Sequence, residues 1–209
     1  MARLKSKILE KAAGQLGQLV VYNVGENTYV RTKPSQYRDR KTETQLAQRQ
    51  KFRLVMNFLR PFTKMLRLTF SDEKGIRKGF HPAKSYNLRH GICGNYPNQS
   101  IDRQKALLSK GPLPLPLQAR VTRKEEGVLF EWKPNNEPET ATDTLLVMAL
   151  APHPSSSDYR FTGIKRSEGQ FLWNTPLNSS NQPVEFWLAF RNQEESLMSN
   201  SLYLGKQPL

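Results

Sequence analysis

The chain has 209 residues, of which 37% are hydrophobic and 24% are charged, and its formal net charge is +14. Its mean hydropathy is −0.66, and no run approaches the roughly 18 apolar residues of a membrane helix, so the sequence predicts no membrane span. A chain of this length accommodates one large domain or two small ones with a buried core. Cys93 is the single cysteine, which excludes an intramolecular disulfide.

Residues 1–22 begin with cations, but Glu10 and Lys11 interrupt the apolar segment that follows. A secretory signal needs a continuous apolar stretch, so the sequence predicts that none is present. The cytoplasm is therefore the expected location, while the single cysteine leaves the redox compartment open.

Positive charge is concentrated in the first half of the chain. Residues 1–111 carry 23 Lys and Arg against 7 Asp and Glu, a net charge of +16, whereas residues 112–209 carry 9 against 11, a net charge of −2. The alternating prolines of residues 111–116 favour extended backbone between the halves. We therefore predict a basic module over residues 1–111 and a neutral module over residues 112–209. Such asymmetry suits a polyanionic partner, although selection for solubility gives the same balance.

The first module is predicted to open with a β-hairpin. Residues 1–16 are expected to be a short helical or irregular lead, and residues 19–22 and 28–32 are β-branched and aromatic runs around a turn containing Gly25. Because strand side chains alternate, Arg31 and Lys33 are expected on one side of the hairpin and Val30 on the other.

Residues 42–70 are predicted to be helical, with Thr42 and Gln45 forming a capping box at the start. Pro61 lacks an amide hydrogen and predicts a kink or a break. Apolar side chains recur at helical spacing at Phe52, Val55, Met56, Phe58, Leu59, Phe62, Met65 and Leu66. A separate face carries Arg49, Arg53, Arg60, Lys64 and Arg67. These cations are either the solvated flank of a core helix or a face that docks on a polyanion.

A charged turn is expected over residues 71–79. It is followed by an irregular connection with one short helix near residues 83–88, and then by a strand at residues 105–109.

The second module is predicted to consist of short strands, because its sequence has short alternating runs separated by turns. The runs are residues 118–122, 128–133, 144–151, 159–165, 170–174, 184–191 and 201–204. This pattern predicts an antiparallel sandwich of the immunoglobulin or fibronectin type III type, with Phe130 and Trp132 in its core and Trp187 on its other face. The predicted class is α+β, with hairpin and helices preceding the sandwich.

No catalytic site is evident from the residue pattern. His81, His90 and Cys93 offer three potential zinc ligands, but a structural zinc site normally has four in paired spacings. Cys93 with His90 as its base lacks an orienting third group. Gly14 and Gly17 lack the rest of a phosphate-binding loop. The sequence therefore predicts a protein that is not an enzyme and has no cofactor or metal.

Binding chemistry is better represented, because eight cations fall within 23 residues alongside Tyr29 and Tyr37. Cations beside aromatic rings neutralise phosphates and stack on bases, although the rings are alternatively core residues. The sequence contains no helix-turn-helix, zinc-finger or RNA-recognition signature, so any nucleic-acid binding is expected to be independent of base sequence. The eight cations are Arg31, Lys33, Arg38, Arg40, Lys41, Arg49, Lys51 and Arg53.

Two groups of motifs stand out along the chain. The first group is GQLGQLVVY at residues 14–22, YVR at residues 29–31, Pro34, and the T-x-x-Q-x-x-x-R-x-x-F pattern beginning at Thr42. The second comprises residues 100–102, 109–111 and 130–132 with Asp143 and the S-N-S-x-Y run at residues 199–203. Together they resemble a family of bacterial proteins of similar length and unknown function that is common in Bacteroidetes.

This chain departs from the family at two places. The frequent S-G-K-V-G-N of other members is replaced at residues 14–18, and Arg40-Lys41-Thr42 lacks a proline common before the helix. The resemblance implies a fold but no activity. Its opening is also loosely similar to small proteins of phage and prophage regions, and its second half to fibronectin type III modules, with Trp132 as a core-strand tryptophan.

The leading interpretation is a non-enzymatic protein whose basic module binds nucleic acid or another polyanion and whose sandwich contacts protein. The residues expected at the polyanion are Arg31, Lys33, Arg49, Arg53, Arg60, Lys64 and Arg67. The alternative is a structural assembly subunit, phage-like or part of a surface complex, whose basic face pairs with an acidic neighbour.

Overall fold

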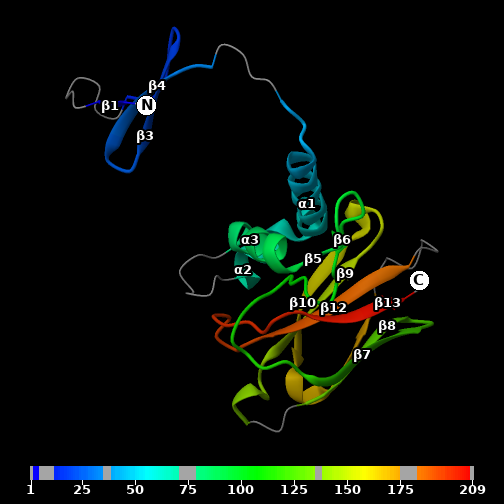
Figure 1. Cartoon of the computed structure of the whole chain (residues 1–209). Coiled ribbons are helices and arrows are strands. Elements are labelled where there is room, and N and C mark those ends of the chain that lie inside the picture. Colours follow the sequence, from blue (N-terminus) through cyan, green and yellow to red (C-terminus); the bar gives the residue numbers. More distant parts are fainter. Residues whose placement is uncertain are drawn as a thin grey trace. The chain divides into compact units, whose positions relative to one another are not determined.

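The computed structural model in Figure 1 describes residues 2–4, 12–34, 39–70, 79–134, 138–174 and 183–207. The chain divides into two compact units, Met1–Thr42 and Glu43–Leu209. The first unit is a small sheet, and the second contains the helices and the sandwich. The predicted α+β class, with a hairpin and helices ahead of an antiparallel sandwich, is confirmed.

The first unit is a four-stranded antiparallel sheet with the strand order β1-β4-β3-β2. The predicted hairpin is formed by β3 and β4, and Gly25 has the positive φ of 61° that its turn requires. Strands β1 and β2 stand where a helical or irregular lead was expected. The strands are β1 (Ala2–Leu4), β2 (Gly14–Leu16), β3 (Leu19–Val24) and β4 (Asn27–Thr32).

The predicted long helix is divided in two at Pro61. Helix α1 (Glu43–Leu59) passes into the 3-10 turn η2 (Arg60–Phe62), from which α2 (Thr63–Thr69) continues. The proline stands in the first turn after α1, where its missing amide hydrogen is tolerated.

Helix α3 (Phe80–His90) is longer than the short helix expected at residues 83–88. Pro82 occupies the first turn of α3, where an amide hydrogen is not needed. A small hairpin of β5 (Ile92–Cys93) and β6 (Ser100–Ile101) follows, and Gln50 of α1 donates a hydrogen bond to the Pro97 carbonyl between these strands.

The predicted sandwich consists of two antiparallel sheets with the orders β10-β9-β12-β13 and β11-β8-β7. Strand neighbours that are distant in sequence, such as β9 and β12, give the sandwich its immunoglobulin-like topology. Each predicted strand is present within a few residues of its expected bounds. The strands are β7 (Leu117–Lys124), β8 (Gly127–Lys133), β9 (Thr144–Leu150), β10 (Asp158–Lys165), β11 (Gln170–Trp173), β12 (Val184–Arg191) and β13 (Leu202–Gln207).

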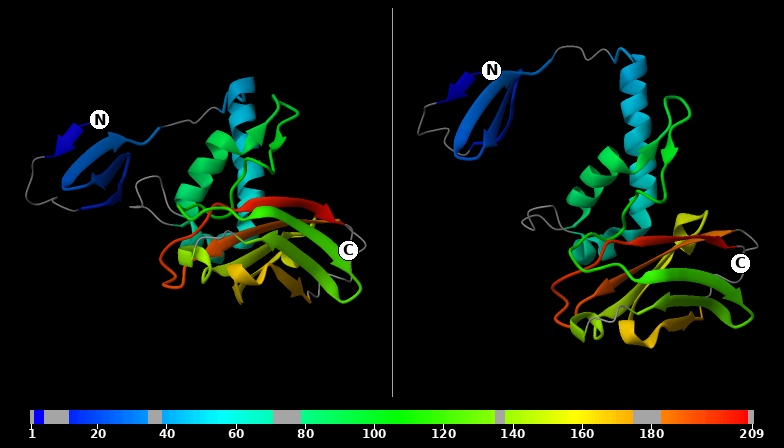
Figure 2. Two further views of the ribbon diagram at one scale, coloured as in Figure 1. Left: turned by 90° about the horizontal axis from the view of Figure 1, so that it is seen from below. Right: turned by 60° about the horizontal axis from the view of Figure 1, so that its bottom comes forward.

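The helices cover the outer face of the four-stranded sheet, so the second unit has three layers (Figure 2). Side chains alternate along β12, and Phe186 is therefore buried between the sheets while Trp187 is buried against the helices. Phe130 and Trp132 lie in the core between the sheets, as predicted. A separate core lies between the helices and the four-stranded sheet, and its helical side includes Val55, Phe58, Leu59, Phe62, Met65 and Leu66.

The predicted boundary at residue 111 does not separate the compact units, because the segment before it is bonded into the sandwich. The Leu108 amide donates to the Ser201 hydroxyl over 2.8 Å, and the Ser109 hydroxyl donates to the Ser199 carbonyl over 2.8 Å. Gly111 donates its amide hydrogen to the Asn200 side chain. The division lies instead between Thr42 and Glu43.

Residues 105–109 do not form the strand that was expected, because side chains rather than a neighbouring strand satisfy their backbone. The Leu107 amide donates to the Asn87 side chain of α3, and the Leu108 amide donates to Ser201. The expected charged turn at residues 71–79 lies outside the described residues except for Gly79.

Candidate functional site

The five cations predicted on the helical face are all exposed. Arg49 and Arg53 lie on α1, Arg60 opens η2, and Lys64 and Arg67 lie on α2. Their exposure follows from the apolar period, because Val55, Phe58, Leu59, Phe62, Met65 and Leu66 turn the opposite side of these helices into the core. Most of the predicted apolar residues are therefore on a different side from the cations, but Phe52, which was predicted on the apolar face, is 43% exposed.

The ion pairs of the described residues do not involve most of these cations. Within the described part of the chain, Arg53, Arg60, Lys64 and Arg67 form no ion pair. The change from α1 to α2 through η2 divides the cations into a group on α1 and a group at η2 and α2. The helical surface can therefore present two adjacent clusters of positive charge to an anionic partner.

Arg31 and Lys33 belong to the other compact unit, the sheet of residues 1–42. Arg31 lies on β4, and Lys33 follows that strand and donates its amide hydrogen to the Gln18 carbonyl. Both side chains are exposed. The seven predicted cations therefore comprise two on the sheet and five on the helices.

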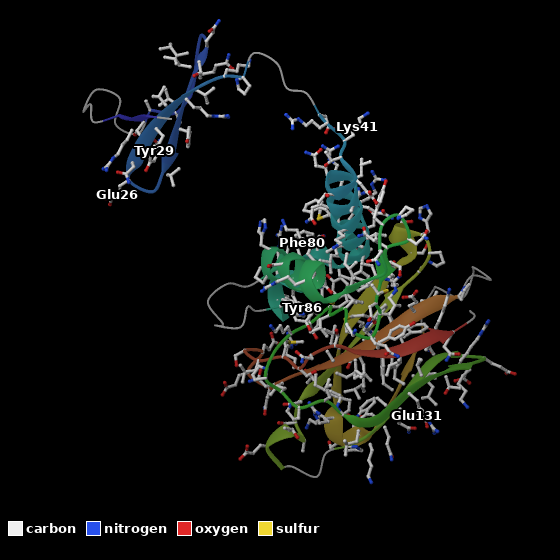
Figure 3. The ribbon with its side chains drawn as sticks, in the orientation of Figure 1. Glu26, Tyr29, Lys41, Phe80, Tyr86 and Glu131 are labelled. Carbon is white, nitrogen blue, oxygen red and sulfur yellow. The ribbon has the colours of Figure 1, made fainter. Side chains whose placement is uncertain are left out.

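Two tyrosines lie next to Arg31 on the same small sheet. Tyr22 of β3 and Tyr29 of β4 are directly paired, and their rings are stacked with centroids 5.8 Å apart and an interplanar angle of 23°. Tyr29 lies within the hairpin, whose turn is marked by Glu26 (Figure 3). Of the aromatic residues named from the sequence, Tyr37 lies outside the described residues.

The sequence analysis did not identify the cross-strand pairing of Tyr22 with Tyr29, although it follows from the position of the hairpin turn. A two-residue turn at Gly25 and Glu26 pairs Val24 with Asn27, and counting outward then pairs the tyrosines. Arg3, which faces Tyr29 from β1, was also missed because no strand was expected there.

The potential zinc ligands are held apart by α3. His81 is in the first turn of this helix and His90 is its last residue, so nine residues at about 1.5 Å each separate them along its axis. Cys93 is exposed on β5, with its sulfur 3.1 Å from the Ser100 hydroxyl. No group of three metal-binding side chains occurs among the residues that the structure describes.

A buried ion pair inside the sandwich was not expected from the sequence. Arg166 is fully buried, donates to the Asp143 carboxylate over 3.0 Å, and stacks on Phe190 with its guanidinium carbon 4.0 Å from the ring centroid. The Trp132 indole donates to the Arg166 carbonyl over 2.7 Å. Burial raises the pKa of Asp143 and outweighs the opposing effect of Arg166.

This cluster joins residues from both sheets of the sandwich. Arg166 was missed because K-R-S-E at residues 165–168 has the composition of an exposed turn.

The outer face of the three-stranded sheet carries a polar depression of about 570 Å³. Its main charges are already paired, because Arg120 donates to both carboxylate oxygens of Glu131 over 3.0 and 2.9 Å. The pKa of Glu131 is lowered by these hydrogen bonds. The lining of the depression also includes Lys133 and Glu168, so charges of both signs surround it.

Comparisons with known proteins give a family and no activity. None of the curated proteins matches this chain in sequence. A crystal structure of the FN1–FN3 domains of chicken CNTN1 is similar at 11% identity and a TM-score of 0.34, over 48% of this chain and 33% of that one. Among the described residues, no helix is both long enough and apolar enough to cross a bilayer. Residues 11–205 match DUF6266, a family of unknown function, and the chain belongs to that family.

Proposed function

We propose that this protein is a non-enzymatic, cytoplasmic binding protein that docks on nucleic acid through its exposed cations, independently of base sequence, and contacts protein through its sandwich. The observation that carries the proposal is the exposure of all five helical cations, while six apolar residues of the same helices are buried, namely Val55, Phe58, Leu59, Phe62, Met65 and Leu66. Phosphate oxygens are the anions that such a cluster neutralises, with release of counterions.

The distribution of charge supports the same assignment. Residues 43–111 carry 14 Lys and Arg against 4 Asp and Glu, whereas residues 112–209 carry 9 against 11. Both of these residue ranges lie in the compact unit Glu43–Leu209. Within that unit, the excess positive charge therefore belongs to residues 43–111, which include the helices. A field of one sign on one layer attracts a polyanion and raises its association rate.

The test is fluorescence anisotropy of a labelled DNA duplex with the full chain at about 50 mM salt, where electrostatic binding is strong. A variant in which Arg49, Arg53, Arg60, Lys64 and Arg67 are changed to Gln should lose most of the affinity. A matched control changes five exposed cations of the sandwich to Gln, namely Arg123, Lys124, Lys133, Arg160 and Lys206. Failure of the wild-type chain to bind either this duplex or single-stranded DNA at this salt concentration overturns the proposal.

An assembly subunit is the second candidate, and a separate observation favours it. The small sheet leaves apolar side chains in solvent, with Leu16 74%, Leu19 43% and Val24 57% exposed. No apolar side chain of that unit is buried among the residues described there. Surfaces of this kind mark protein contacts. Concentration-dependent oligomers that survive nuclease treatment, measured by sedimentation velocity, would favour this candidate over nucleic-acid binding.

A further inference from the structure

One face of the small sheet combines aromatic rings with arginines in a regular pattern. Arg3 of β1 is paired with Tyr29 of β4, which is paired with Tyr22 of β3. Directly paired residues of antiparallel strands point to the same side, so these three side chains form one row across three strands. Arg31 is two residues from Tyr29 along β4 and therefore lies on the same face.

The opposite face has different chemistry. Val21 is paired with Val30, and Leu19 with Thr32, so the corresponding positions there are apolar or small and uncharged. Among the strand residues that the structure describes in this sheet, the aromatic and cationic side chains thus lie on a single side. Side chains alternate between the two faces along each strand, so residues of one kind at every second position gather on one face. A hairpin can form without such a distribution of residue types.

The side chains of the aromatic face are accessible. Arg3 and Arg31 are exposed, and Tyr22 and Tyr29 are partly exposed. The two rings lie on the central strands β3 and β4 and are stacked on one another at an interplanar angle of 23°.

We infer that this face, defined by Arg3, Tyr22, Tyr29 and Arg31, binds single-stranded nucleic acid by stacking unpaired bases on the tyrosines. Aromatic side chains on a sheet are a recurrent platform for unpaired bases, and every base has a face that can stack. The flanking arginines neutralise the phosphates of the same strand, which is the charge complementarity that the partner requires. In a duplex the bases are stacked on one another and cannot reach the tyrosines.

This inference rests on the proposed nucleic-acid binding and specifies its substrate as single-stranded. It also assigns separate roles to the two groups of cations. The helical cations attract any polyanion, whereas the aromatic face discriminates between unpaired and paired strands.

The test compares fluorescein-labelled oligo(dT) with a DNA duplex of equal phosphate number, using the full chain and fluorescence anisotropy. The wild-type chain should bind oligo(dT) more tightly than the duplex. The double variant Tyr22→Val and Tyr29→Val removes both rings but keeps residues that favour strands. It should bind oligo(dT) on the order of 5- to 100-fold more weakly, with little change for the duplex.

The matched control is Tyr22→Phe with Tyr29→Phe, which keeps both rings and should retain the preference for oligo(dT). Arg31→Gln changes one exposed side chain, and it should weaken oligo(dT) binding and reduce its salt dependence. Equal binding of both DNAs by wild type, with no effect of the valine variant, overturns the aromatic platform but leaves the proposed function standing. Failure of wild type to bind either DNA overturns both.

Discussion

The rings of Phe58 in α1 and Trp187 in β12 lie 5.8 Å apart, centroid to centroid, at an angle of 57°. Both side chains are buried, and Trp187 is on the sheet face opposite to the core between the sheets. An isolated sandwich would expose this tryptophan to water. The helices and the sandwich are therefore one folding unit from Glu43 onward.

Replacing Phe58 with Ala should destabilise the helices and the sandwich together. The change leaves a cavity against Trp187 and should lower the free energy of unfolding by about 3–5 kcal/mol. Urea unfolding followed by far-UV circular dichroism and by tryptophan fluorescence should give coincident transitions. Leu68→Ala is the control, because Leu68 is 65% exposed and should change the free energy by no more than about 0.5 kcal/mol. Two separate transitions would contradict a shared core.

Replacing Ser201 with Ala should destabilise the same unit through one lost hydrogen bond. The Leu108 amide, now paired with the Ser201 hydroxyl, would be buried without a partner, at a cost of about 1–3 kcal/mol. Thermal or urea unfolding measures the change. Ser167→Ala is the matched control on an exposed serine, and an equal loss in both variants would show that the Leu108 hydrogen bond is not the cause.

The buried pair of Asp143 and Arg166 predicts a large effect of one substitution and a small effect of two. Asp143→Ala leaves the Arg166 charge buried and should cost about 3–5 kcal/mol. The double variant Asp143→Leu and Arg166→Met removes both charges and should recover much of that loss in urea unfolding. Glu131→Ala breaks the exposed pair with Arg120 and should leave the unfolding midpoint unchanged. Additive losses in the double variant would refute the pairing argument.

The sandwich could be predicted strand by strand, because its alternating runs are bounded by turns. The boundary between the two compact units could not be predicted, because the prolines of residues 111–116 resemble an interdomain linker and placed the expected boundary there. Hydrogen bonds from Leu108 and Ser109 to residues near the C-terminus hold that segment against the sandwich. Such long-range pairing leaves no periodic signal in the local sequence.

The second group of motifs, between residues 100 and 203, falls largely on this buried framework, whereas the first group includes strands of the small sheet. Ser109, Ser199 and Ser201 hold the connecting segment, while Asp143 and Trp132 contact Arg166. These contacts show that the second group of motifs supports the fold. For the candidate site, exposure of the cations was predictable from the apolar period, but the row of Arg3, Tyr29 and Tyr22 depends on strand pairing to β1.

The most direct test of nucleic-acid docking is the salt dependence of duplex binding by the wild-type chain and the five-glutamine helical variant. The logarithm of the binding constant should fall steeply with the logarithm of salt concentration, by about 0.9 per phosphate neutralised. The helical variant should have a shallower slope, by up to about 4.5 for its five cations, and the sandwich control should keep the wild-type slope. Binding that does not respond to salt, or an unchanged slope in the helical variant, would contradict the account.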